Sequence, residues 1–186
     1  GVALGSVLLL VTAGNIVQLI AGWIGAGVAV QRLLLTYATR TGAQLAGRKK
    51  AMVNRGSNGA LVLAGIMLYA AAGTGDIATL LAEAEITWMW TFAAILLAIS
   101  AMLASAQVPF HGWLTEVMEA PTPVSALLHA GVVNAGGFLL IRFADLILLN
   151  PVLLSALVFL GGASALIGSI VMLTQPAIKT ALAWST

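Results

Sequence analysis

The sequence consists largely of long apolar runs, separated by short segments that hold most of the charges. A helix that crosses the roughly 30 Å hydrocarbon core of a bilayer needs about 20 mainly apolar residues. Of the 186 residues, 61% are hydrophobic and 8% are charged, whereas soluble domains carry about 25% charged residues. A water-soluble core of this size cannot bury so much apolar surface. The pattern therefore predicts a polytopic membrane protein.

The apolar runs are predicted to be helices, because an open sheet leaves backbone groups unsatisfied in lipid. The predicted fold is an all-α, polytopic transmembrane helix bundle. The expected spans are residues 1–12, 15–37, 57–73, 86–106, 124–148 and 151–173, with a last one starting after Pro176. The first residues show neither the basic n-region nor the cleavage site of a signal peptide. We expect residues 1–186 to be an internal fragment of one transmembrane domain, with about five full spans and two truncated ones.

The charged residues predict the orientation in the membrane. Five of the eight basic residues are Arg40, Arg48, Lys49, Lys50 and Arg55. Such clusters mark the cytoplasmic side, so we expect a solvated cytoplasmic loop at 38–55. The linker 74–86 has three acidic and no basic residues, which favours the outer side. This topology fits a multi-pass protein of a bacterial inner (plasma) membrane.

Composition and motifs exclude several functions. The formal net charge of +2 is too small for a nucleic-acid-binding surface. The absence of cysteine excludes disulfides and cysteine-ligated metal centres. Metalloprotease, nucleophile-elbow and P-loop motifs are missing. We therefore expect neither catalytic residues nor a cofactor in this chain.

A proline is predicted to break the span that begins near residue 86. Pro109 removes a backbone donor and crowds the preceding turn, so the helix should break near 105–109. The side-chain amide of Gln107 could satisfy a freed carbonyl. Unpaired backbone at membrane depth implies a polar cavity.

Ionisable residues inside a membrane are costly and are candidates for function. His129 lies in an apolar run, where it is either a proton-exchanging group or a neutral, hydrogen-bonded histidine. Lys179 either titrates in a low dielectric or extends to the membrane surface. Glu116 and Glu119 share one helical face after His111, and the alternative is a polar helix end that faces water.

Two further cations have simpler interpretations. Arg142 and Asp145 are spaced for a structural ion pair at the end of a span. Arg32 has no acid nearby in the sequence, so it must find a distant partner or extend to the membrane surface.

The run 105–129 contains a Ser-Ala-Gln-x-Pro break, a Trp-Leu pair, a Pro-Thr-Pro-Val-Ser-Ala-Leu turn and a helix histidine. In these motifs it resembles the core of the antiporter-like subunits of respiratory complex I and of Mrp sodium/proton antiporters. The end, Ile-Lys-Thr-Ala-Leu-Ala-Trp-Ser-Thr over 178–186, is similar to the family's Leu-Lys-Arg-x-Leu-Ala-Tyr-Ser motif. The resemblance implies an antiporter-like bundle that conducts protons or other cations. In it, His129 would be the relay, Lys179 the adjacent titrating cation, and Glu116 with Glu119 a cytoplasmic acidic entrance.

Within this family, the chain looks most similar to the membrane subunits of DAB inorganic-carbon pumps (the DabB group). The pointers are Phe-His-Gly-Trp at 110–113, Val-Met-Glu-Ala-Pro at 117–121, and the segment 129–142. This resemblance implies a large cytoplasmic, zinc-binding partner related to carbonic anhydrases. The pair would couple proton-motive force to CO2 hydration and bicarbonate accumulation.

Three departures distinguish the chain from the complex I pattern. It has Ile24 where that pattern has a buried glutamate, Ala104 where it has a lysine, and Asn58 where an aspartate is common. Loss of the glutamate–lysine charge pair at positions 24 and 104 favours the carbon-pump interpretation over a complex I or Mrp subunit. It also motivates a third hypothesis, a non-conducting membrane anchor for the catalytic partner.

The predicted orientation can be tested with single cysteines, because the chain has none of its own. A cysteine at Arg48 should be shielded from an impermeant thiol reagent added outside intact cells, whereas one at Glu83 should be labelled. The reverse labelling pattern would invert the topology.

Overall fold

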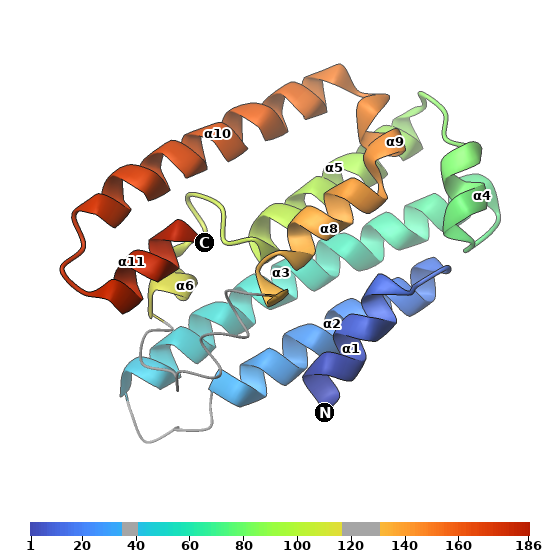
Figure 1. Cartoon of the computed structure of the whole chain (residues 1–186). Coiled ribbons are helices and arrows are strands. Elements are labelled where there is room, and N and C mark those ends of the chain that lie inside the picture. The colour runs from blue at the N-terminus through green and yellow to red at the C-terminus, as the bar shows by residue number, and fades with distance from the viewer. Residues whose placement is uncertain (35–40, 117–130) are drawn as a thin grey trace.

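The computed structural model describes residues 1–34, 41–116 and 131–186. Within these ranges it is helical and contains no strand. The helices are α1 (Val2–Val11), α2 (Ile16–Leu34), α3 (Thr41–Ala72), α4 (Ile77–Ala82), α5 (Trp88–Ala104), α6 (Gly112–Glu116), α8 (Ala135–Arg142), α9 (Ala144–Leu148), α10 (Pro151–Leu173) and α11 (Ile178–Ser185). Figure 1 shows the long helices lying side by side with roughly aligned axes. The predicted all-α bundle is confirmed.

Helix α3 corrects the predicted loop at 38–55, which is helical from residue 41 onward. The segment lacks proline and is rich in alanine, lysine and arginine, which favour helices. At 1.5 Å per residue, the 32 residues of α3 span about 48 Å, more than the hydrocarbon thickness. Arg48 and Arg55 are exposed on its surface, which favours a position outside the hydrocarbon for this half of α3, ahead of the apolar stretch 57–72.

Lys50 is a second correction, because it was expected on a solvated loop. Only 2% of its surface is exposed. Its side chain turns into the bundle and lies over the indole ring of Trp113.

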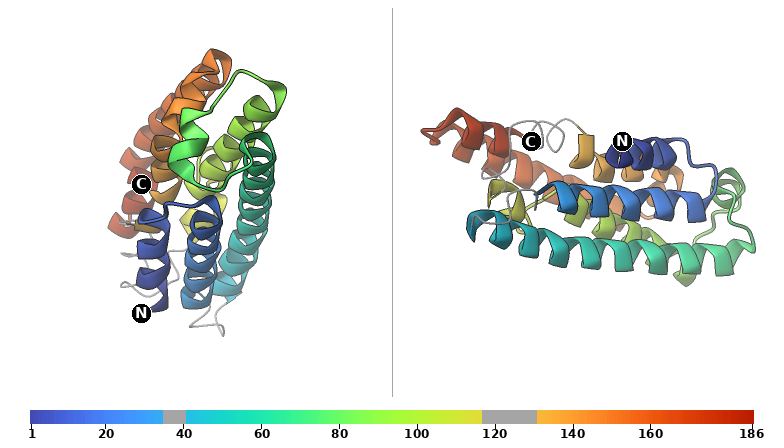
Figure 2. Two further views of the ribbon diagram at one scale, coloured as in Figure 1. Left: turned by 90° about the vertical axis from the view of Figure 1, so that its right-hand side faces the viewer. Right: turned by 90° about the horizontal axis from the view of Figure 1, so that it is seen from below.

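The core is formed by aliphatic side chains from neighbouring helices, which pack in the order α1–α2–α3–α5–α8 (Figure 2). Leu19, Leu61, Leu97, Leu139 and Phe143 are fully buried there. Close contact depends on small residues, as in other membrane bundles. A Cβ at Gly22 would lie 2.6 Å from the backbone nitrogen of Leu10, and one at Gly25 would lie 2.7 Å from the hydroxyl of Ser6.

Two turns are joined at one end of the bundle. Ile16 N–H donates to Gly75 O (2.8 Å), and Ile77 N–H donates to Gly14 O (2.9 Å). The predicted linker 74–86 contains the short helix α4, which Asp76 caps by accepting a hydrogen bond from the backbone N–H of Thr79. That hydrogen bond, together with one from the Thr79 hydroxyl, holds the pKa of Asp76 below its ordinary value.

The predicted span at 124–148 is not one helix in its described part, residues 131–148. Phe143 separates α8 from α9. Arg142 donates to the carbonyl of Ala13 at 2.6 Å, and no ion pair joins it to Asp145, which is exposed. The predicted Arg142–Asp145 pair is therefore wrong, because the guanidinium satisfies a carbonyl near the end of α1. Arg32 is exposed in the last turn of α2.

Helix α10 lies along the outside of the bundle (Figure 1), and large apolar side chains such as Phe159 and Leu166 are exposed on it. By length and composition, Ile16–Leu33 and Pro151–Leu173 could each cross a membrane. Val2–Val11 and Trp88–Ala104 are shorter apolar helices.

Adjacent glycines in α8 provide a matched test of its packing on α5. A Cβ at Gly136 would collide with the Ser105 side chain and the Ala101 carbonyl, whereas a Cβ at Gly137 would meet nothing within 4 Å. Gly136→Ala should therefore destabilise the protein by about 1–3 kcal/mol. Gly137→Ala should be neutral or stabilise it by up to about 1 kcal/mol. Thermal unfolding of the purified protein in detergent measures both, and equal effects would contradict the packing described.

Candidate functional site

The candidate site is the break between α5 and α6. Helix α5 ends at Ala104 and α6 begins at Gly112, so the predicted break at 105–109 is confirmed. Between them Ala106 has φ 51°, a left-handed backbone conformation uncommon for residues other than glycine. The Val108–Pro109 peptide is cis. Pro109 has no N–H, so the helical hydrogen-bond ladder cannot continue through it.

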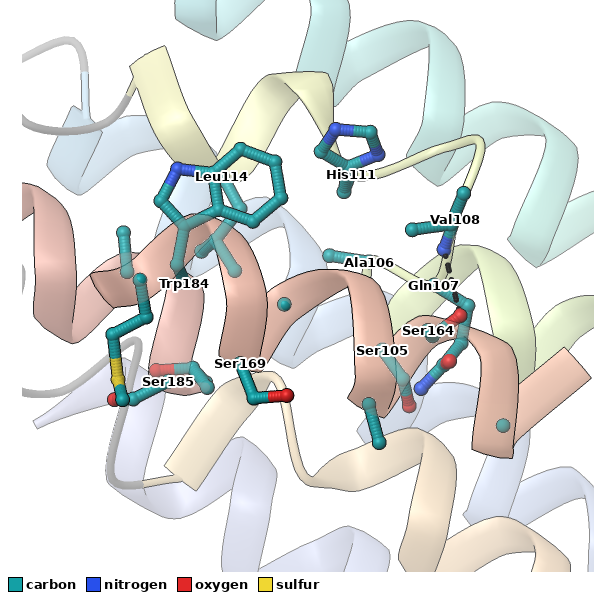
Figure 3. Close-up of a pocket in the computed structure, with 16 residues that line it drawn as sticks. Ser105, Ala106, Gln107, Val108, His111, Leu114, Ser164, Ser169, Trp184 and Ser185 are labelled. Carbon is teal, nitrogen blue, oxygen red and sulfur yellow. Dashed lines mark hydrogen bonds between the residues drawn. The ribbon is translucent and has the colours of Figure 1, made fainter. Parts of the chain in front are cut away.

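Helix α10 supplies a hydrogen-bond partner for the exposed backbone of the break. The N–H of Val108 donates to the hydroxyl of Ser164 at 3.1 Å (Figure 3). The hydropathy of residues 151–173 predicts only an apolar span and does not reveal this contact. The signal that could have found it is the presence of three serines, Ser155, Ser164 and Ser169, in this otherwise apolar run.

A cavity of about 330 Å³ lies among the break, α10 and α11. Its polar lining includes Ser105, Gln107, His111, Ser164, Ser169, Ser185 and Thr186. The ring of His111 lies 5.0 Å from that of Trp184 on α11, measured between centroids. The break thus adjoins a partly polar cavity, whose outer lining, including Ser169 and Ser185, is exposed.

Two side-chain atoms of this site are buried without a hydrogen-bond partner in the described part of the chain: Gln107 Oε1 and His111 Nδ1. Leaving such an atom unsatisfied costs about 1–3 kcal/mol. The adjoining cavity is large and polar enough to admit water molecules that would satisfy both atoms. An imidazole among water molecules can accept and donate protons.

The predicted site residues are only partly placed. His111 and Gln107 line the cavity, and Pro109 lies in the break itself. Glu116 belongs to α6 and Lys179 to α11, but their side chains lie outside the described part of the structure. His129 and Glu119 lie outside the described residues, so their predicted roles stay predictions. No group of three potential metal ligands occurs in the described ranges.

Residues 13–186 match the model of the transmembrane family of NADH:quinone oxidoreductase and Mrp antiporters. The chain belongs to this family. The resemblance expected from residues 105–129 is thereby confirmed, and the chain is part of an integral membrane protein.

Individual relatives refine the comparison. The chain is 40% identical to a probable inorganic carbon transporter subunit DabB of Hydrogenovibrio crunogenus, covering 100% of this chain and 36% of the relative. It is 37% identical to NADH-quinone oxidoreductase subunit L of Mycobacterium tuberculosis, covering 98% of this chain and 29% of that protein. The chain thus spans about a third of the length of these relatives. The expected similarity to DAB carbon-pump subunits is confirmed.

A solved structure shows the same fold. A chain in the structure of the Mrp complex from Dietzia sp. DQ12-45-1b superposes with a TM-score of 0.86 at 27% identity. The match covers 98% of the present chain and 20% of that chain.

Proposed function

We propose that this chain is part of a cation-translocating, proton-conducting membrane subunit that drives inorganic carbon accumulation. The observation that carries the proposal is the polar cavity at a helix break, lined by His111 and Gln107. The family membership and the similarity to inorganic carbon transporter subunits support it. We place residues 1–186 within one antiporter-like domain of about five full spans and two truncated ones, in a bacterial inner membrane.

Proton movement requires a set of ordered water molecules and a side chain that exchanges protons, and the break supplies both. Backbone groups freed from the helix and the hydroxyls on α10 can hold a connected set of water molecules. Along such water, His111 can accept a proton at one ring nitrogen and release one from the other. We propose that His129 is the central relay, with Lys179 as the neighbouring cation and Glu116 with Glu119 as an acidic entrance.

The proposed partner is a large, cytoplasmic, carbonic-anhydrase-like subunit that holds zinc. Hydration of CO2 yields bicarbonate and a proton. In this proposal, inward proton flow through the membrane subunit supplies the free energy that keeps the partner's reaction running toward bicarbonate. In this proposal the membrane subunit is not itself an enzyme. Its role is to translocate protons.

The second candidate is a complex I or Mrp-type subunit. The 37% identity to the mycobacterial subunit L supports it. Ile24 and Ala104 argue against it, because they stand where that pattern has a glutamate and a lysine. A non-conducting anchor is the third candidate, and the polar cavity argues against it.

Purification of the full-length protein from its native membrane separates the first two candidates. We expect a large zinc-containing protein to copurify in fixed ratio, with zinc measured by elemental analysis. Flavin and iron–sulfur subunits in its place would establish a respiratory complex, and other antiporter subunits an Mrp assembly.

Histidine substitutions separate a conductor from an anchor. His129→Ala and His111→Phe should each lower inorganic carbon uptake at least tenfold, because neither replacement exchanges protons, while the complex still assembles. Phe110→Leu is the matched control, since 47% of Phe110 is exposed outside the cavity. Normal uptake in both histidine variants would favour the anchor.

A further inference from the structure

A polar stripe on α3 faces the interior of the bundle. It consists of Lys50, Asn54, Ser57 and Asn58, whose spacing places them on one helical face. All four line a second cavity of about 30 Å³, together with Trp23 and Ala104. A cavity needs roughly 10–15 Å³ to hold a water molecule, so this one has room for about two.

Hydrogen bonds fix two of the neutral members of the stripe, Ser57 and Asn54. Trp23 Nε1–H donates to the hydroxyl of Ser57 at 3.3 Å. That hydroxyl donates to the carbonyl of Ser100 on α5 at 3.0 Å. Asn54 Nδ2–H donates to the carbonyl of Gly27 on α2 at 3.3 Å. The stripe is therefore a positioned polar surface between α2, α3 and α5.

Lys50 is the charged member, and its partner is aromatic. Its Nζ lies 3.7 Å from the centroid of the Trp113 ring, a cation–π geometry that favours the ammonium form. Burial acts in the opposite direction and lowers the pKa of Lys50 to about 7. Lys50 lies between the exposed Arg48 and Arg55, outside the apolar span of α3. Both protonation states are thus accessible near neutral pH.

The charged groups around Lys50 are few in the described part of the structure. No ion pair with a carboxylate contributes there, and burial is the cause of its lowered pKa. On the packed elements, the other titratable or charged side chains are Arg32 on α2, Arg48, Lys49, Arg55 and Tyr69 on α3, and His111 beside α6. Glu116 ends α6, and its side chain is outside the described set.

Helix α6 stands between the two cavities. Leu114 and the preceding His111 line the larger cavity at the break, whereas Trp113 lies against Lys50. Trp113 is 1% exposed, and its Nε1–H has no hydrogen-bond partner among the described residues. One short helix therefore separates a protonatable histidine from a protonatable lysine.

We propose that Lys50 is a proton-exchanging residue of the translocation pathway, at the basic end of α3 and across α6 from the His111 cavity. This inference rests on the proposed proton translocation. In the exchange, the ammonium N–H bond breaks and its proton passes to a water molecule in the α3 cavity, which leaves a neutral amine. A proton arriving from the basic end then restores the ammonium.

A spectroscopic titration tests the exchange without requiring transport. Indole emission responds to a charge against its face, so emission assigned to Trp113 should change with a midpoint near pH 7 in the purified full-length complex. The contribution of Trp113 is obtained by subtracting the spectrum of Trp113→Phe. Lys50→Met and Lys50→Arg should abolish the transition, whereas His111→Phe should leave it. A flat profile between pH 5.5 and 9 overturns the proposal.

Proton uptake by reconstituted vesicles tests the role in the pathway. Lys50→Met should reduce the initial rate to below about one-tenth of wild type. Lys50→Arg should do the same, because arginine keeps the charge but does not release its proton. Lys49→Met is the matched control and should transport normally. Wild-type rates in Lys50→Arg would show that charge alone suffices and would overturn the proposal.

The two tests separate this inference from the proposed function. If wild-type vesicles take up no protons while the Trp113 transition persists, translocation fails and Lys50 remains a proton-exchanging group outside any pathway. If wild-type vesicles take up protons and the transition is absent, translocation stands and Lys50 has no part in it.

Discussion

The backbone at the α5–α6 break is the constraint on which the site depends. Within a membrane, water is scarce and each free N–H or carbonyl must find a partner inside the protein. At the break, the hydroxyl of Ser164 on α10 meets this need for Val108. The hydrogen bond joins α10, which otherwise lies on the outside of the bundle, to the segment between α5 and α6. Most of the neighbouring α10 residues that face the cavity are small, among them Gly161, Ala165 and Gly168.

Polar groups in the described part of the bundle are segregated from its apolar packing. The core around Leu61 and Leu97 is aliphatic, and glycines such as Gly22 and Gly136 let helix backbones approach closely. Hydrophilic side chains gather instead on either side of α6, in the cavity at the break and along α3. A further cavity of about 120 Å³ beside the break has a mostly apolar lining, so the polar lining is concentrated in these two places.

Hydropathy and proline placement predicted most of the helices and the break, because both depend on local sequence. The extent of α3 was missed, since a basic segment predicts solvent exposure even when it is helical. The helical spacing of Lys50, Asn54, Ser57 and Asn58 predicts that their side chains share one face of α3. Periodicity alone does not say whether that face is buried or exposed. The contact between Arg142 and Ala13 joins residues 129 positions apart, so no local pattern could reveal it.

The two cavity volumes differ by an order of magnitude, which bears on ion selectivity. Six water molecules around a sodium ion need roughly 60–90 Å³ in the same measure, at about 10–15 Å³ each. The chamber at the break, with about 330 Å³, can admit a sodium ion in that shell, but the α3 cavity, with about 30 Å³, cannot. A proton moves between water molecules without carrying a shell. By size alone, the α3 cavity has room for water molecules along which a proton could move, but not for a hydrated sodium ion.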